Sequence, residues 1–208
     1  MAYQLIHDIQ PTTNDSQYVN APFDEGKKLL EKAGYRIINL RENAQLRMKS
    51  GKDAFISQNG NWVAEDFVYV LSKGIYMTKP ENSQIMQNAK KATNAHRSGN
   101  EFYLNEKQVE QSLEGAFLIP DTLRAVPTNR FAEEGLTAFA FGEDAQAYGD
   151  FLKNAGINEM PIYKASMQDK PFARKLWFGD LGNRSVLSGS SWNLGGGGGM
   201  RGVRRASA

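Results

Sequence analysis

Residues 177–204 constrain the fold more than any other part of the chain. There, aromatic, aliphatic and arginine residues alternate with positions that are almost all Gly, Ser, Asn or Asp. A flexible linker would not keep two tryptophans, and an ordinary core strand would not contain five consecutive glycines, because Gly loses the most backbone entropy on folding and packs nothing. The pattern predicts an anchored frame that presents residues whose identity the fold does not constrain, which is typical of a binding surface. The frame residues are Trp177, Phe178, Leu181, Arg184, Leu187, Trp192, Leu194, Met200, Arg201, Val203 and Arg204.

Length and composition limit the classes of protein to consider. The 208 residues fit one domain, from 1 to 208. The net charge is +2 and the basic residues are scattered, whereas a nucleic-acid-binding protein needs a basic face. The lack of cysteine excludes disulfides, thiol nucleophiles and thiolate metal sites. No apolar run is long enough to span a membrane and the first residues do not resemble a signal peptide, so we expect no membrane insertion and, by default, a cytoplasmic location.

Helix and strand signals are mixed without regular alternation, which predicts an α+β fold with small antiparallel sheets and two or more helices. Pro22 with the acidic Asp24 marks a helix start, and Gly34 marks its end. Asn105 and Gln108 have the spacing of a capping box. We expect helices at 22–34, 79–95, 105–114 and 143–154, one helical turn before residue 54, an edge strand and a loop within 1–20, and further strands at 35–40, 54–57, 61–71, 75–78, 116–119, 136–141, 157–165, 172–181 and 200–205.

Residues suited to catalysis or metal binding are not grouped along the chain. His7 and His96 are far apart and lack ligand spacing, which favours a surface or hydrogen-bonded histidine for each. Ser190 and Ser191 have no nearby histidine and no nucleophile-elbow pattern. Adjacent acids in polar segments are expected to face solvent. We therefore predict no enzyme activity, no metal site and no cofactor. The acid pairs are Glu65 with Asp66, Glu133 with Glu134, and Glu143 with Asp144.

The glycine run at 195–199 has three interpretations. A phosphate-binding loop needs a helix after it, and too little chain follows for one. A flexible tail is the second interpretation. The third is an ordered closing strand at 200–204, because an apolar residue lies between two arginines there. We favour the strand, paired near the N-terminal strand or near the strand at 172–178.

Aromatic residues at strand spacing are more often core than part of a ligand site, although a sugar-stacking surface is the alternative. We therefore expect a mostly buried set, which consists of Trp62, Phe67, Tyr69, Trp177, Phe178 and Trp192.

The residues from Arg184 to Asn193 (Arg-Ser-Val-Leu-Ser-Gly-Ser-Ser-Trp-Asn), followed by Arg201 to Arg204 (Arg-Gly-Val-Arg), support a resemblance to a known fold. This ending is similar to that of C-type-lectin-like domains of the formylglycine-generating-enzyme type. Those enzymes use cysteines that this chain lacks, so the resemblance does not imply their activity.

The same segment more closely resembles the variable proteins of diversity-generating retroelements, especially the archaeal ones. In that family a reverse transcriptase miscopies adenines and rewrites Asn codons of the form AAC at the C-terminus of a C-type lectin fold. The resemblance implies a variable region at about 179–200, with ligand-binding residues at positions that hold AAC-reachable amino acids. We call these the display positions. They are Asp180, Gly182, Asn183, Ser185, Ser188, Gly189, Ser190, Ser191, Asn193, Gly195, Gly196, Gly197, Gly198 and Gly199.

The resemblance implies a protein or cell-surface ligand, without nucleic acid. Two other hypotheses stay open: a cysteine-less relative of the formylglycine-generating enzymes with enzymatic or sugar-binding activity, and a structural interaction protein with a glycine-rich tail.

If the display positions form a binding surface, their burial and their tolerance of substitution can be predicted. Gly196, Gly198 and Ser190 should accept large side chains together, whereas Gly195 or Gly199 should resist if it has a left-handed backbone. The residues expected to be buried are Trp177, Leu187, Trp192 and Val203, and those expected to be exposed are Gly182, Ser190 and all five glycines at 195–199.

Overall fold

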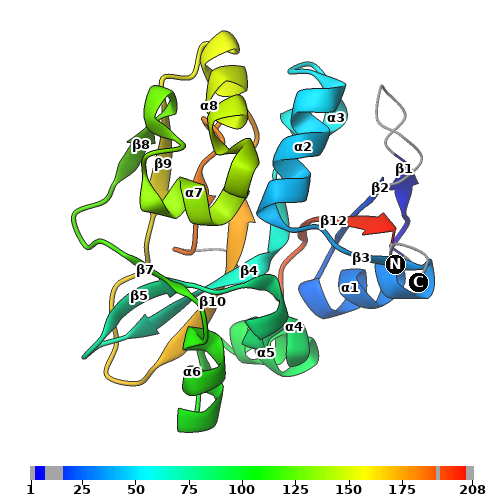
Figure 1. The fold of residues 1–208 in the computed structure, drawn as a ribbon. Coiled ribbons are helices and arrows are strands. Elements are labelled where there is room, and N and C mark those ends of the chain that lie inside the picture. Colours follow the sequence, from blue (N-terminus) through cyan, green and yellow to red (C-terminus); the bar gives the residue numbers. More distant parts are fainter. Residues whose placement is uncertain (1–2, 8–15, 191–192, 205–208) are drawn as a thin grey trace.

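The computed structural model describes residues 3–7, 16–190 and 193–204. It confirms the predicted α+β class: the strands join in one mostly antiparallel hydrogen-bonded network, and helices pack on both of its faces (Figure 1). No helix in these ranges is long and apolar enough to cross a membrane.

The strand β4 (Asn61–Val70) is the centre of the network, and all ten of its residues are buried. It pairs antiparallel with β10 (Phe172–Phe178), with a register shift between Lys175 and Trp177, and forms a hairpin with β5 (Gly74–Met77). Because helices cover both faces, this strand lacks the polar alternation of a half-exposed strand.

One face of β4 packs against a larger hydrophobic core. Val63 and Phe67 point into it from the strand, and the covering helices are α2 (Leu40–Ser50), α7 (Gly135–Phe141) and α8 (Ala145–Asn154). Figure 1 shows these helices together on one side of β4.

The opposite face of β4 packs against a second core. Trp62 and Val68 point into it, together with buried residues of α1 (Phe23–Lys32), α4 (Gln84–Gln87) and α5 (Ala89–Arg97). Successive side chains of a strand alternate between faces, so one strand serves both cores.

The adjacent acids Glu65 and Asp66 are buried, so the prediction that they face solvent was wrong. They lie on opposite faces of β4, and each is compensated there. Both oxygens of Glu65 accept the Leu40 N–H, at 3.0 and 3.3 Å, and burial raises the pKa of Glu65 to about 7. Asp66 forms a 2.7 Å ion pair with the fully buried Lys175 and accepts a hydrogen bond from Ser83. The buried charge of Asp66 is stabilised because it is paired in this way.

The strand β12 (Gly198–Arg204) closes the sheet, as predicted. It lies antiparallel to β2 (Ser16–Ala21) and meets β4 in parallel at Met200 and Trp62. Its last residues also pair with β3 (Tyr35–Ile37). The strand therefore pairs with the N-terminal segment and is separated from β10 by β4. The hypothesis of a glycine-rich tail is wrong for these residues.

Two predicted strands are helices. The segment at 54–57 overlaps α3 (Phe55–Gln58), and 136–141 lies within α7 (Gly135–Phe141). The buried residues of α7 include Leu136, Thr137, Ala140 and Phe141, a spacing that matches one face of a helix. A short apolar run is compatible with a buried strand or a buried helix, and tertiary packing chose the helix here.

Helix lengths also differ from the predictions. The expected helix at 79–95 is broken into η1 (Pro80–Asn82), α4 and α5, because the Ser83 side chain caps α4 and a new helix begins after Asn88. The expected single turn before residue 54 is instead α2, an eleven-residue helix with an Asn39 capping box.

Other boundaries agree with the sequence signals. Asn105 and Gln108 form the predicted capping box of α6 (Glu106–Leu113), and Gly156 follows α8 with a φ of 86°. Pro22 is the N-cap of α1 rather than part of its first turn. The remaining elements are β1 (Ile6–His7), β6 (Phe102–Tyr103), β7 (Phe117–Ile119), β8 (Ala125–Pro127), η2 (Thr128–Arg130), η3 (Gly142–Asp144), β9 (Glu159–Tyr163) and β11 (Leu187–Ser188).

A truncation tests the role of β12. A chain that ends at Gly197 should not fold, because β2, β3 and β4 lose a shared partner and the buried Met200 and Arg201 are removed. A chain that ends at Arg204 keeps all of β12 and is the matched control. We expect a cooperative thermal transition by circular dichroism for the control only; equal melting curves would contradict the role of β12.

Candidate ligand-binding surface

The first display positions lie in a turn that follows β10. The Asp180 carboxylate accepts the Asn183 backbone N–H at 2.8 Å and the Asn183 side-chain amide at 3.0 Å. Gly182, Asn183 and Arg184 are exposed, and Arg184 forms an ion pair with Glu159. Asp180 therefore shapes the turn, and the residues that it holds form an exposed tip.

Ser185 is buried at the base of this turn, contrary to the expectation for a display position. Its hydroxyl lies 2.7 Å from an Arg47 guanidinium nitrogen and 2.6 Å from the Tyr148 hydroxyl. The same Arg47 nitrogen donates to the Gly179 carbonyl, and the guanidinium stacks over the Phe178 ring at 4.1 Å. Ser185 therefore helps to satisfy a buried cation, which an exposed display residue would not do.

Ser188 and Gly189 are also buried, because β11 inserts between two longer strands. Ser188 pairs with Trp177 on one side and with Tyr163 on the other. The Gly189 carbonyl accepts the Tyr69 hydroxyl at 3.0 Å, and a Cβ at Gly189 would lie 2.6 Å from the Phe67 ring. These two predicted display positions are therefore covered by neighbouring strands.

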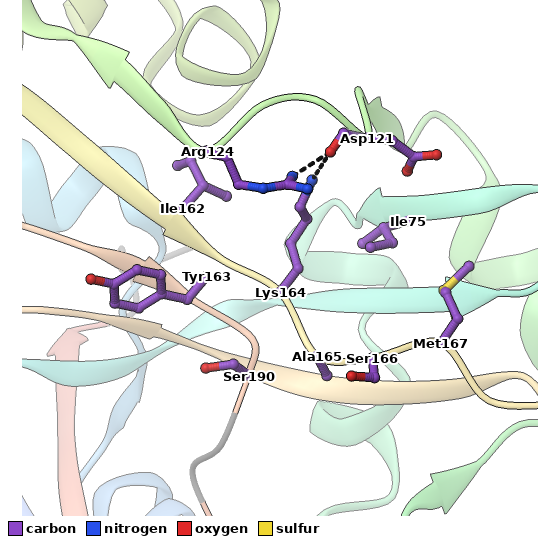
Figure 2. Close-up of a pocket in the computed structure, with 10 residues that line it drawn as sticks. All are labelled: Ile75, Asp121, Arg124, Ile162, Tyr163, Lys164, Ala165, Ser166, Met167 and Ser190. Atoms are coloured by element: carbon purple, nitrogen blue, oxygen red, sulfur yellow. Dashed lines mark hydrogen bonds between the residues drawn. The ribbon is translucent and has the colours of Figure 1, made fainter.

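Ser190 is partly exposed and borders an open cavity of about 630 Å³ (Figure 2). We call this the cationic cavity. It is built from β9, the segment after β9, the β7–β8 connection and β5. Its other lining residues are Ile75, Asp121, Arg124, Ile162, Tyr163, Lys164, Ala165, Ser166 and Met167.

Two cationic side chains in this cavity share one neutral acceptor. Lys164 donates to the Asp121 carbonyl at 2.9 Å and to the Pro120 carbonyl at 3.1 Å, and Arg124 donates to the same Asp121 carbonyl. Figure 2 shows the Asp121 carboxylate turned away from both cations. Burial, and then the nearby Arg124 charge, lower the pKa of Lys164, and the Asp121 charge raises it to a smaller extent. The two cations outnumber the one carboxylate that lines the cavity, so the cavity has excess positive charge.

Asn193 is exposed and borders a second cavity of about 160 Å³. There, Arg174 is paired with Glu101, while His96 is buried and accepts the Leu194 N–H through Nδ1 at 3.3 Å. Burial, and then the charge of Arg174, lower the pKa of His96 to about 4. The histidine is thus neutral at physiological pH and fixes the backbone after Asn193, as expected for a hydrogen-bonded histidine.

The five glycines at 195–199 differ in exposure. Gly196 and Gly197 are exposed, as predicted, and Gly195 is partly exposed. Gly198 and Gly199 are buried, so the exposure expected for them was wrong. They already belong to β12 and pack against aromatic rings.

Steric space, rather than a left-handed backbone, decides which of these glycines can change. None of the five has a positive φ. A Cβ at Gly196 would meet nothing closer than 3.6 Å, and at Gly197 it would lie 3.2 Å from an Asn20 side-chain oxygen. The closest contacts elsewhere are 2.2 Å to the Arg97 side chain for Gly195, 2.3 Å to the Trp62 ring for Gly198, and 2.3 Å to the Tyr18 hydroxyl for Gly199.

The frame is only partly as predicted. Leu187, Leu194 and Met200 are fully buried. Trp177 and Val203 were expected to be buried but are partly exposed. The Trp177 and Trp62 rings pack edge to face, with ring centroids 5.8 Å apart, and Trp177 lies in the middle of the sheet, between β4 and β11.

The aromatic set is mainly core, as expected: Trp62, Phe67, Tyr69 and Phe178 are buried. Two further positions, Ser191 and Trp192, lie outside the described residues. The burial expected for Trp192 and the display role expected for Ser191 therefore stay predictions.

Some display positions are close together and others are not. Ser190 and Asn193 each border a cavity, whereas Gly182 and Asn183 border neither of these two. Sequence reasoning missed Arg47, Lys164 and Arg124, because scattered basic residues carry no local signal of a shared site. Within the described ranges, no group of three or more His, Cys, Asp or Glu residues is arranged to hold a metal ion.

Comparisons with known proteins identify the fold. No family model and no curated protein matches the chain. A solved structure, described as "Accommodation of massive sequence variation in Nanoarchaeota by the C-type lectin fold", matches with a TM-score of 0.66 and 17% sequence identity. The match covers 96% of this chain and 100% of the solved chain. The protein therefore has a C-type lectin fold, as the resemblance in the C-terminal segment implied.

Two glycine substitutions test the steric division. Gly198→Ala should lower the free energy of unfolding by about 1–3 kcal/mol, because the new methyl group overlaps the buried Trp62 ring. Gly196→Ala should change it by no more than about 0.5 kcal/mol, because the site is open. Urea unfolding of both variants measures the difference, and equal destabilisation would show that the glycines are not divided in this way.

A second test uses the pH dependence of stability. The pKa of His96 is about 4 in the folded protein and about 6.5 when unfolded, so the unfolded chain binds the proton first as the pH falls. The contribution of the neutral His96 to the free energy of unfolding is complete above about pH 6.5 and is lost as the pH falls to about 4. The total loss is roughly 3 kcal/mol. Glu65 acts in the opposite direction, because its pKa of about 7 exceeds its ordinary 4.5 and its contribution falls as the pH rises through this range.

The His96→Asn variant separates the two effects. Asn retains an acceptor for the Leu194 N–H but does not titrate. The stability difference between wild type and variant should shift in favour of the variant as the pH falls from 7.5 to 4.5 in urea unfolding. A difference that is constant with pH would contradict a buried, neutral His96.

Proposed function

We propose that this C-type lectin fold is a ligand-binding, receptor-like protein whose exposed C-terminal positions are diversified by a retroelement, and that it has no catalytic role. One observation carries the proposal: buried frame residues and exposed, sterically open small residues alternate within a single segment. We call these positions the open set: Gly182, Asn183, Ser190, Asn193, Gly196 and Gly197. Ser190 is partly exposed, and a Cβ at Gly182 or Gly197 would lie 3.1 or 3.2 Å from a side-chain oxygen, that of Asp180 or Asn20 respectively.

The separation of stability from recognition supports this function. Leu187, Leu194 and Met200 are fully buried, and each contributes roughly 1.5–3 kcal/mol by its burial. Exposed substitutions usually change stability by less than about 0.5 kcal/mol. A protein with this division can change its binding residues without unfolding.

The identity of the exposed residues also supports diversification. An AAC codon readily yields Ser, Gly or Asp when its adenines are miscopied, and Asn when they are kept, and the open set contains only Asn, Ser and Gly. The solved structure with this fold is described as accommodating massive sequence variation. We infer the same use of the fold here.

We propose a protein or a cell-surface component as the ligand. The open positions lie on an exposed turn and beside two open cavities, which suits an extended partner surface. The net charge of +2 gives no general attraction for nucleic acid.

An enzyme-like alternative rests on Glu65, whose raised pKa and position beside Arg41 and Lys79 in a cavity of about 360 Å³ resemble an acid–base site. Both Glu65 oxygens, however, accept the Leu40 N–H at the start of α2. We therefore assign this carboxyl to the placement of the helix.

Two matched libraries test the proposal. One randomises the six open positions, and the other randomises six closed display positions. Displayed variants are sorted first for protease resistance and then for binding to an arbitrary folded protein. The closed positions are Ser185, Ser188, Gly189, Gly195, Gly198 and Gly199.

Most variants of the open library should resist protease, and binders should be recoverable from it, because its side chains project into solvent. Few variants of the closed library should survive, because its positions are buried or abut other atoms. Equal survival of the two libraries, or a stable open library without binders, would overturn the proposed function.

A further inference from the structure

We infer that the cationic cavity beside Ser190 recognises a carboxylate group, flanked by apolar atoms, on a protein ligand. The inference rests on the proposed function, since the ligand of this cavity is taken to be the ligand of the display positions. It concerns residues outside the variable region, so it can be tested without changing any display position.

The arrangement of the two cations is the first argument. Lys164 and Arg124 donate to the same carbonyl oxygen, that of Asp121, so their charges are held close together. Within the described ranges, the hydrogen bonds of both side chains go to backbone carbonyls, and neither side chain forms an ion pair with a carboxylate. Like charges repel at this range, and the attraction of both cations to an anion between them offsets that repulsion.

The remaining donors are the second argument. The Lys164 ammonium has three N–H groups and uses two on carbonyls, while the Arg124 guanidinium has five and uses one nitrogen. The nearby Asp121 carboxylate points away from both side chains (Figure 2). Unused charged donors of this kind match the two oxygens of a carboxylate. A bound anion would also raise the pKa of Lys164, because it stabilises the charged ammonium. In the free protein, burial and the Arg124 charge lower this pKa.

The walls of the cavity favour a carboxylate over phosphate. Ile75 and Ile162 are buried, and Met167 is partly buried, so part of the lining is apolar. A dianion costs more to bring against such a wall than a single carboxylate does. An acidic side chain or a C-terminal carboxylate with apolar neighbours can pair with the cations and also contact the apolar lining of the cavity.

The position of the cavity gives the interaction a role. Ser190 is at its border, and the exposed Tyr163 lies beside it. Fixed cations can hold one acidic group of a ligand while an exchangeable residue at position 190 contacts its neighbours. Recognition then combines a constant anchor with a variable contact.

The experiment titrates the whole protein with isovalerate, which is an apolar monocarboxylate, and follows the Lys164 and Arg124 side-chain signals by NMR. Isovaleramide, with the same shape but no charge, is the matched ligand control, and inorganic phosphate is the competing anion. We expect saturable shifts with isovalerate, binding roughly tenfold weaker with isovaleramide, and a rise in the Lys164 pKa in the isovalerate complex.

Variants locate the site. Lys164→Gln and Arg124→Gln should each weaken isovalerate binding by roughly tenfold, whereas Lys107→Gln, in a different cavity, should leave it unchanged. Because Lys164 also holds the β7–β8 connection, Arg124→Lys provides a variant that keeps the charge and should retain most of the binding.

The outcomes separate this inference from the proposed function. Equal binding of isovalerate and isovaleramide, stronger binding of phosphate, or indifference to Lys164→Gln and Arg124→Gln would overturn the carboxylate site. The open library could still yield binders in that case. Conversely, the cavity could bind isovalerate as expected while most variants of the open library fail to fold. That result would support the carboxylate site and overturn the proposed display function.

Discussion

The insertion of β12 between β2 and β4 is the constraint on which the rest of the structure depends. The strand pairs with segments from the first third of the chain, and its Met200 and Arg201 are buried where the two halves of the sheet meet. This long-range pairing joins the C-terminal strand to the N-terminal segment in one sheet. The residues just before β12 are therefore held at a fixed place on the surface, although many are glycines.

This constraint gives neighbouring glycines different roles. Gly198 and Gly199 are within the strand, and the Trp62 ring and the Tyr18 hydroxyl occupy the space that their side chains would need. Gly196 and Gly197 precede the strand and face solvent. A substitution at the first pair disturbs packing, whereas one at the second pair changes only the surface. The boundary between frame and display surface thus falls inside the glycine run.

The proposed binding surface combines exchangeable and constant residues. Ser190 and Asn193 are small side chains beside cavities whose other residues come from distant parts of the chain. The charges of Lys164 and Arg124, and the neutral His96, belong to the constant part. A surface built in this way can vary its contacts while its electrostatic character stays the same.

The sequence by itself determined the α+β class, the capping box of α6, the closing strand and the frame of Leu187, Leu194 and Met200, because these follow from local periodicity, capping chemistry and apolar spacing. Only the tertiary structure decided that 136–141 is a helix, that Glu65 and Asp66 are buried, and that Ser185, Ser188 and Gly189 are covered. The physical reason is the same in each case. Burial and charge compensation depend on side chains that are far away in sequence, such as Lys175 for Asp66 and Arg47 for Ser185, and no local pattern records them.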